Sequence, residues 1–369
     1  MKIKCRYFFN PEDKKLIKNC VIYWDKSLKQ IKISDNSNEY EKELEYVIPA
    51  FKDQHVHLFL SGFRNSKIRE KELSCSESQS IKNVISNIKR LKKAGIFQVM
   101  DAGDSKWSAL KVRDMQIFDD FEVKLCGKAL FKRGRYGSFI GIEIFNKKSL
   151  KDALKILKEK NVDFIKVLNS GINSIKEYAK ETDPQFTDSE MEYIVKFAKE
   201  HNLEVIVHVN GEKAIRQTIK HNISRLEHAF FIKDENLIKD IAQKGIRIVP
   251  TFRAMLNLKD NETLSEFEKE IIEKTVDNHI KEIKKFLKYG GKLELGTDSG
   301  SYNVIHGKSF YDEIEFFMTK LEFSFEEILS LISSIKSPAI IELKEFSFSC
   351  LNTCPIYLLH LQPVPQNKP

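Results

Sequence analysis

The sequence lacks the features that mark membrane, secreted and nucleic-acid-binding proteins. No uninterrupted apolar run reaches membrane-spanning length, and residues 1–10 lack the long apolar stretch of a signal peptide. The 6 cysteines include no CxxC pair, which argues against a disulfide scaffold and against a thiolate zinc site. No basic stripe with interleaved aromatic residues is present. We therefore expect a cytoplasmic protein with reduced thiols and with neither membrane nor nucleic acid among its partners.

The charged residues that are present are mixed in sign. The 61 lysines and arginines are interleaved with 53 acidic residues, and the net charge is +8. Such a mixture is typical of a solvated surface. With 369 residues, 41% of them hydrophobic, the chain can bury a large core and still carry a small additional domain.

The apolar pattern divides the chain into two parts. Within residues 1–47, Leu16–Trp24 and Gln30–Ile33 are predicted strands of a small β domain. From Val47 onward, short apolar runs alternate with helical patterns, which is typical of an α/β fold. The predicted strands are Val47–Phe51, Ile96–Met100, Val123–Phe131, Phe164–Leu168, Glu204–Val209, Arg225–Glu227, Arg247–Pro250 and Leu293–Gly296. Eight such alternations predict a (β/α)8 TIM barrel over residues 48–345.

The segments between these runs have helical spacing. A long charged insertion, Asn257–Gly290, separates the last two predicted strands and is also expected to be helical. The other predicted helices are Ser80–Lys93, Ser149–Lys160, Ser189–His201, Glu212–His221 and Glu235–Gln243.

Metal-ligating residue types stand at the predicted strand ends, where barrel enzymes build their active sites. His55 and His57 are two apart in an extended segment, so both side chains point the same way. The remaining candidates are Lys166, His208, His228 and Asp298. This nitrogen and oxygen set suits Zn²⁺, and it also suits Mn²⁺, Ni²⁺ or Fe²⁺.

Lys166 lies within an apolar strand, where an ammonium group is costly to bury. Two interpretations are open. The lysine forms an ion pair with a nearby acid, or burial lowers its pKa and the neutral amine captures CO2 as a carbamate.

Six segments together resemble the amidohydrolase superfamily, and they are most similar to its imidazolonepropionase-like and prolidase-like branch. These segments are VIPAFKDQHVHL, DFIKVLNSG, VIVHVNGEKAI, RLEHAFF, IVPTF and LGTDSG. The resemblance extends from about Leu16 to about Leu343 and includes all six candidate ligands in the same order.

The resemblance implies a binuclear site. His55, His57 and Asp298 would bind one metal ion, His208 and His228 the other, and carboxylated Lys166 would bridge the two. A bridging hydroxide would attack the substrate carbonyl, and Asp298 would carry its proton to the leaving nitrogen.

Several neighbouring residues have expected supporting roles. Arg135 and Tyr136, in a loop after the third strand, and His306, after the eighth, are candidate substrate contacts, although a solvated loop is an equally good interpretation of the first two. We expect Glu227 to form an ion pair below the site and Thr297 to donate a hydrogen bond to Asp298.

The predicted activity is hydrolysis of a C–N amide bond in a small molecule such as an N-acyl amino acid, a dipeptide or a cyclic amide. A hydantoinase- or dihydroorotase-type cyclic amidase would use the same six ligands. A mononuclear deaminase would not need Lys166, and it would carry an acid at position 211, where this chain has Gly211. An inactive scaffold is disfavoured because no ligand is missing. The oligomeric state is left open, a homo-oligomer included.

Residues 346–369 differ in composition from the Lys- and Glu-rich chain before them. They hold one lysine, two cysteines and four prolines, which are Pro355, Pro363, Pro365 and Pro369. Members of the family usually end with a segment that completes the small sheet. Our hypothesis is that this atypical tail replaces the native C-terminal strands through a frameshift, which would leave the small β-sandwich-like domain incomplete, with an uncovered edge.

Overall fold

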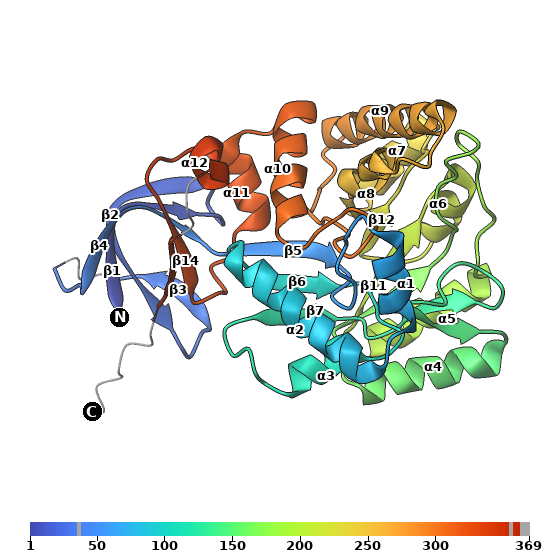
Figure 1. Ribbon diagram of the computed structural model, residues 1–369, viewed down its shortest axis with the longest axis horizontal. Helices are drawn as coiled ribbons and strands as arrows, with labels where there is room; N and C mark the ends of the chain where they lie inside the picture. Colours follow the sequence, from blue (N-terminus) through green and yellow to red (C-terminus); the bar gives the residue numbers. More distant parts are fainter. Residues whose placement is uncertain (35–37, 354–356, 362–369) are drawn as a thin grey trace.

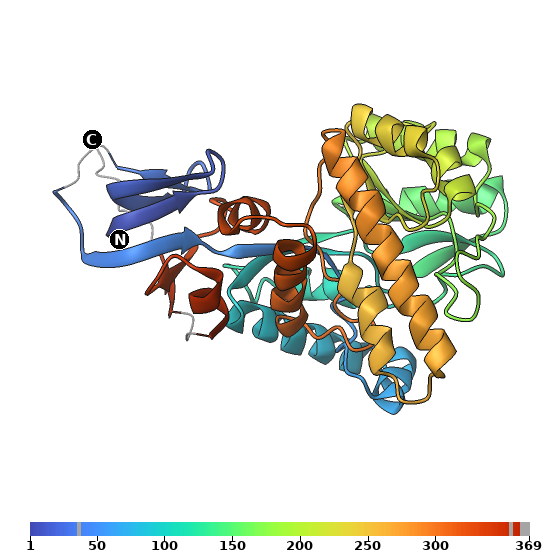
Figure 2. The ribbon, with the colours of Figure 1, turned by 90° about the horizontal axis from the view of Figure 1, so that it is seen from above.

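The computed structural model describes residues 1–34, 38–353 and 357–361. It contains a small sheet and a barrel of parallel strands surrounded by helices (Figure 1). Figure 2 shows the two units side by side, joined by the chain that runs from β4 into β5. None of the helices in these ranges combines the length and the apolar character that a membrane span needs.

The small sheet is built from both ends of the described chain. Its strand order is β15-β14-β4-β1-β2-β3, with β1 parallel to β4 and antiparallel to β2. Alternating residues such as Ile3 and Cys5 are buried in one apolar cluster with Ile22 and Leu44, which is the pattern of a sheet with one covered face. The strands are Lys2–Asn10 (β1), Lys15–Asp25 (β2), Gln30–Ile33 (β3), Lys42–Pro49 (β4), Ala339–Leu343 (β14) and Tyr357–His360 (β15).

The two strands predicted for the small domain are confirmed as β2 and β3. The expected uncovered edge of this sheet is wrong for β4, because β14 pairs with it in antiparallel register and β15, a strand of the tail, in turn pairs with β14. Residues 354–356 and 362–369 of the tail lie outside the described residues, and its origin in a frameshift stays a prediction about the coding sequence.

The barrel has eight strand positions among the described residues. Each position is called a stave below, because one is formed by two short strands and one by an irregular segment. The first two are β5 and β6, the third is formed by β7 and then β8, and the next four are β10 to β13. The segment around Leu293–Thr297 closes the ring, because Glu294 N–H donates to Ile248 O and Gln54 N–H donates to Leu295 O, both at 3.0 Å. The strands are Phe51–Val56 (β5), Ile96–Asp101 (β6), Glu122–Leu125 (β7), Ala129–Lys132 (β8), Gly141–Ile144 (β9), Phe164–Leu168 (β10), Glu204–Val209 (β11), Arg225–His228 (β12) and Arg247–Val249 (β13).

Three predicted barrel strands differ from the structure. Val47 belongs to β4 of the small sheet, and the first stave begins at Phe51, because only Ala50 separates two buried strands and their apolar residues form one run. The run Val123–Phe131 is interrupted between β7 and β8. The eighth run, Leu293–Gly296, is no regular strand, since Leu293 pairs with Ile248 only as an isolated bridge.

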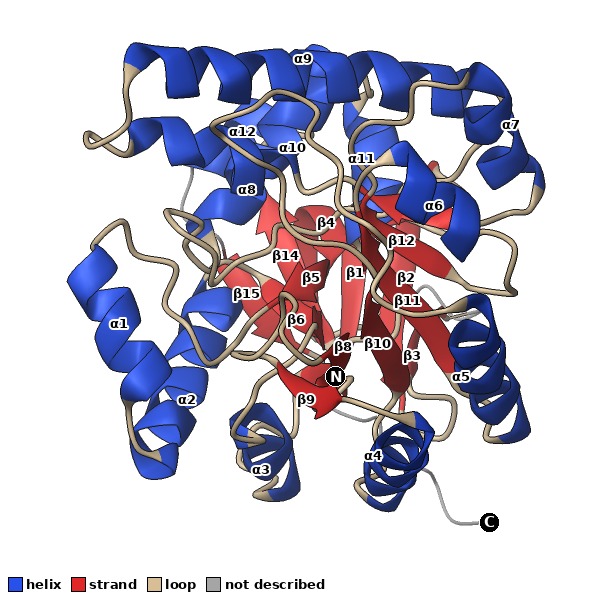
Figure 3. Ribbon diagram, turned by 90° about the vertical axis from the view of Figure 1, so that its right-hand side faces the viewer, coloured by secondary structure: helices blue, strands red, loops and turns tan. Residues whose placement is uncertain are grey.

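Helices surround the strands when the barrel is viewed along its axis (Figure 3). In α4 the buried residues Leu150, Ala153, Leu154 and Leu157 recur at helical spacing and form one apolar face. The helices are Ser66–Ser74 (α1), Glu77–Lys93 (α2), Ser108–Asp114 (α3), Lys147–Glu159 (α4), Asp188–Glu200 (α5), Glu212–Thr218 (α6), Glu235–Gln243 (α7), Phe252–Leu256 (α8), Glu266–Lys288 (α9), Lys308–Lys320 (α10), Phe325–Ile332 (α11) and Phe348–Thr353 (α12), with a 3₁₀ helix at Asn257–Asp260 (η1). Each helix predicted from the spacing is present, and α9 and η1 occupy the charged insertion.

Candidate metal centre

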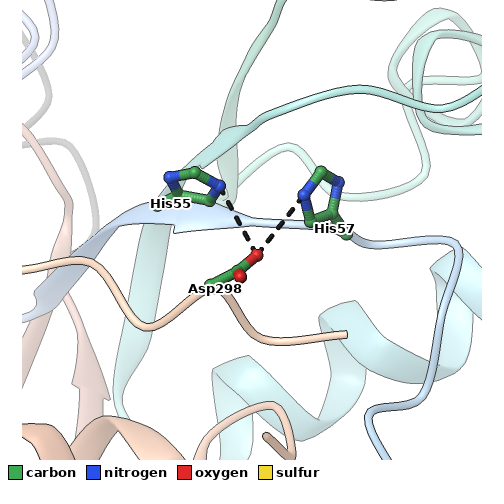
Figure 4. Close-up of side chains that lie close together, drawn as sticks. All are labelled: His55, His57 and Asp298. Atoms are coloured by element: carbon green, nitrogen blue, oxygen red, sulfur yellow. Dashed lines mark ion pairs between the residues drawn. The ribbon is translucent and has the colours of Figure 1, made fainter. Parts of the chain in front are cut away.

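Three of the predicted ligands converge at the C-terminal end of the barrel strands. Asp298 Oδ1 lies 3.5 Å from His55 Nε2 and 3.4 Å from His57 Nε2 (Figure 4). One donor atom from each of the three residues lies within 4.8 Å of the others. The backbone brings them together, because Asp298 N–H donates to His55 O at 2.8 Å across the seam of the barrel. The three side chains therefore form a compact set of two nitrogen donors and one carboxylate.

The ring of His55 is oriented from below by Glu227 on β12. His55 Nδ1–H donates to Glu227 Oε2 at 2.5 Å, which leaves Nε2 facing Asp298. Arg225 Nη2 lies 2.6 Å from Glu227 Oε1. Burial raises the pKa of Glu227, but the charges of Arg225, His55 and Lys166 outweigh it and hold that pKa well below its usual range. The predicted ion pair below the site is confirmed, and Glu227 also contacts a candidate ligand directly.

The second ring, His57, and the carboxylate are fixed by the loops that follow the strands. His57 Nδ1–H donates to Gly103 O at 3.1 Å, and Ser301 Oγ–H donates to Asp298 Oδ2 at 2.8 Å. The expected bond from Thr297 to Asp298 is wrong. The Thr297 hydroxyl donates to Asp53 Oδ2 at 2.7 Å, because Thr297 faces the interior of the barrel one residue before the chain turns toward the site.

The remaining three candidates stand opposite this set. The rings of His208 and His228 have centroids 4.7 Å apart, and the rings of His55 and His228 have centroids 5.3 Å apart. His228 Nδ1 lies 2.6 Å from Thr251 Oγ1, while His208 Nε2–H donates to Gly171 O at 3.2 Å. One ring nitrogen of each histidine thus makes a hydrogen bond to the protein, and the other nitrogen remains free to bind a metal ion.

Lys166, in the middle of β10, is the most unusual residue of the site. Its side chain is 2% exposed, and its Nζ makes no hydrogen bond within the described part of the chain. It does form an ion pair with Glu227 Oε1 at 3.7 Å, which is the pairing with a nearby acid that the sequence left open. An ammonium group without a hydrogen bond is costly in such a place, and burial lowers the pKa of this amine although the charge of Glu227 opposes it. The site is therefore incomplete around Lys166 without a further group.

Burial also sets the protonation of the histidines. It lowers the pKa of His208 to about 3 and the pKa values of His57 and His228 well below the usual range of histidine. These imidazoles are neutral at pH 7, which is the form that binds metal ions. The neutral rings, the Asp298 carboxylate and the Lys166 amine, which makes no hydrogen bond among the described residues, fit a centre for divalent cations of the transition series.

The six candidate ligands line one small cavity, together with Arg69, Tyr136 and several apolar residues. A wider cavity of about 230 Å³ continues outward from it. Its lining shares Arg69, Tyr136, His208, His228, Asp298 and Ser301 with the inner cavity and adds Ile172, Asn173, Asn210, Phe230, Thr251, Ala254, Met255, Leu258 and Tyr302.

Of the three predicted substrate contacts, only one lines the cavities of the site. Tyr136 lies in both cavities, with its ring centroid 5.4 Å from that of His208. Arg135 is exposed and donates from Nη2 to Asp183 O at 2.6 Å, and His306 is buried and donates from Nε2 to Leu60 O at 2.9 Å. Neither Arg135 nor His306 lines the two cavities.

Arg69 is a site residue that the sequence analysis missed. It lies on α1, lines both cavities, and donates from Nη1 to Gly300 O at 2.7 Å. The chain has 61 lysines and arginines, and no local sequence pattern distinguishes Arg69 from the others. Its position 12 residues after His57 is the only available hint, and loop shape decides whether such a residue reaches the site.

Comparison with known proteins identifies the family and the fold. Residues 46–337 match the model of the Amidohydrolase family. The fold is similar to that of a Xaa-Pro dipeptidase with bound methionine in the active site, with 18% identity, 96% of each chain covered and a TM-score of 0.79. It is also similar to ochratoxinase from A. niger (16% identity, 96% of this chain and 92% of that chain, TM-score 0.77) and to molinate hydrolase (12% identity, 97% and 93%, TM-score 0.75). No match was found among curated protein sequences.

Proposed function

The chain belongs to the amidohydrolase family, whose members are metal-dependent hydrolases of C–N bonds, and on this premise we propose that it cleaves the amide bond of a small substrate at a centre of two divalent metal ions, most suitably Zn²⁺. His55, His57 and Asp298 would hold one ion, and His208 and His228 the other. Bound divalent cations acidify water and polarise a carbonyl group.

Lys166 would complete the centre as a carbamate. Its neutral amine would attack the carbon of CO2, an N–C bond would form as one C=O π bond opens onto oxygen, and the proton released from the nitrogen would pass to solvent, which leaves a carboxylate. This step removes a buried amine without a hydrogen-bond partner and supplies an anion between the two sets of ligands. The buried Nζ of Lys166, which makes no hydrogen bond among the described residues and lies among neutral histidines, is the observation that carries the proposal.

Two further side chains of the site would transfer protons and bind the substrate carbonyl group. Asp298 has two carboxylate oxygens with different tasks: Oδ1 faces His55 and His57, while Oδ2 is held by Ser301. This carboxylate would accept a proton from the attacking water and deliver it to the leaving nitrogen. The hydroxyl of Tyr136, which has no hydrogen bond among the described residues, would donate to the substrate carbonyl oxygen.

The cavity supports an N-acyl amino acid or a dipeptide as substrate. The Arg69 guanidinium has donors left over after its bond to Gly300, and a guanidinium binds a carboxylate with two parallel hydrogen bonds. The outer wall, with Ile172, Met255 and Leu258, is apolar and would receive the rest of the substrate.

Metal content measured by elemental mass spectrometry tests this function. We expect about two zinc ions per chain after expression with zinc and bicarbonate, and clearly fewer in Lys166→Met. Lys128→Met, which changes another partly buried lysine, is the control and should keep both ions. The loaded protein should then hydrolyse N-acyl amino acids or dipeptides. One ion per chain in wild type and Lys166→Met alike would contradict the binuclear centre.

A further inference from the structure

A second cavity lies at the opposite end of the barrel, where the strands begin. It measures about 280 Å³ and is lined by residues of β5, β6 and β7, by the turn between β1 and β2, and by the end of α11 and the segment that follows it. Figure 1 shows these strand ends facing the small sheet, away from the ligands at the far end of β5. This cavity is separate from the proposed active site.

Three lysines, Lys52, Lys124 and Lys336, line the cavity, and none of them forms an ion pair within the described part of the chain. Lys52 is half-buried, whereas the other two are exposed. Burial lowers the pKa of Lys52, the charge of Glu294 partly opposes this, and the positive charges of Lys124 and Lys336 lower it further. The three ammonium groups therefore repel one another across a shared space.

The two buried or partly buried carboxylates near Lys52, those of Asp53 and Glu294, are bound by other residues. Asp53 accepts hydrogen bonds from the backbone and the hydroxyl of Thr297. Glu294 is shared between Arg225 and Arg247, each at 2.7 Å. Glu12 and Glu122 also line the cavity, but both are exposed, and Glu122 accepts a hydrogen bond from Gln98 at 2.8 Å. The inner wall thus presents a cation that forms no ion pair among the described residues, and the carboxylate whose charge reaches it, that of Glu294, is already bound by two arginines.

Ser333 provides an independent indication of a ligand. It lines the same cavity, it is 2% exposed, and its Oγ has no hydrogen-bond partner among the described residues. A buried hydroxyl without a partner is costly, and a negatively charged oxygen is its best acceptor. A buried free donor and a half-buried free cation therefore line one space.

We propose that this cavity binds a small oxyanion, a phosphate or a carboxylate, between the ammonium group of Lys52 and the hydroxyl of Ser333. Lys124 and Lys336 would stand at the mouth and attract the anion. Such a ligand offers the acceptors that both inner groups lack, and a divalent or extended anion would also reduce the repulsion among the three lysines.

Isothermal titration of the zinc-loaded protein with inorganic phosphate, and separately with succinate, tests the proposal and distinguishes the two kinds of anion. We expect one of them to bind wild type, and binding to be at least about tenfold weaker in Lys52→Met. Ser333→Ala should weaken binding severalfold. Lys128→Met, a partly buried lysine outside the cavity, should bind as wild type does.

Lys52→Met and Ser333→Ala also distinguish binding in this cavity from binding at the metal ions. An anion that binds at the metal ions would bind both variants as tightly as wild type, and that outcome would overturn the proposal. Absence of binding of both anions to wild type would overturn it as well. If Lys52→Met fails to fold, as judged by its thermal unfolding, Ser333→Ala alone decides, because the removal of an unpartnered hydroxyl leaves the fold intact.

Discussion

Two residues of the metal centre adopt a strained backbone. Asp298 and His228 have φ values of 59° and 67°, in the left-handed region that non-glycine residues rarely occupy. Hydrogen bonds fix both turns, from Asp298 N–H to His55 O and from Ala229 N–H to Val209 O. Such strain persists only where the surrounding structure imposes it, and here it turns both side chains toward the cavity.

Arg69 is the residue whose replacement should separate binding from chemistry. In Arg69→Met, we expect KM for an N-acyl amino acid to rise at least about tenfold with a smaller change in kcat, since an Arg–carboxylate pair is lost. Arg64→Met is the matched control, because Arg64 is 47% exposed and pairs with Glu262. Steady-state kinetics measures both values. An equal rise in KM for a substrate without a carboxylate would contradict the assigned role.

His306 should make stability depend on pH. Burial lowers its pKa to about 4, so the unfolded chain, with a pKa near 6.5, binds the proton more tightly. The stability that neutral His306 contributes is complete above pH 6.5 and is lost as pH falls toward 4. Between pH 7 and pH 5, the difference in unfolding free energy between wild type and His306→Gln should shrink by about 2 kcal/mol. Urea denaturation at the two pH values measures it, and a constant difference would show that His306 does not carry this shift.

Helix α9, like α4, α5 and α11, begins with a capping box. Ser265 Oγ accepts a hydrogen bond from Glu268 N–H, and Glu268 Oε2 accepts one from Ser265 N–H at 2.9 Å, which makes a capping box. The helix buries Ile272, Val276 and Ile283 against the barrel helices. The capping box therefore stabilises α9, a helix that the alternating strands and helices of the barrel do not by themselves require.

Ser265→Ala should lower the unfolding free energy by about 1 kcal/mol, because one orphan amide of the first turn loses its partner. Ser86→Ala, at an exposed position within α2, is the control and should be neutral or slightly stabilising. Thermal or denaturant unfolding compares the two variants. Equal stability of both would mean that the end of α9 frays without cost.

At the scale of the whole molecule, the metal ions should hold the barrel closed. Three of the six candidate ligands lie on the first stave and just after the eighth, and the seam between those staves has few regular strand pairings. A ligand that binds only the folded state stabilises it by mass action. Removal of metal with a chelator should lower Tm by at least about 5 °C, and zinc should restore it. An unchanged Tm, once elemental analysis shows the metal gone, would contradict this role.

The sequence by itself was sufficient for the order and type of the candidate ligands and for most of the elements around them. Periodicity is a local property, so β10, β11 and α7 could be predicted with their exact or nearly exact bounds. The ligand positions follow from strand ends in the same way, because parallel strands in a barrel end on one face.

Only the tertiary structure decided what depends on residues far apart in the chain. The eighth stave is defined by hydrogen bonds to β5 and β13 rather than by its own pattern, and β14 leaves the barrel to cover β4. Arg69 reaches the cavity, Thr297 bonds Asp53, and Lys52 and Ser333 share a second cavity, although these residues carry no local signal. The physical reason is that side-chain partners are chosen by packing across the whole barrel, whereas a sequence pattern reports only what neighbouring residues along one strand or helix have in common.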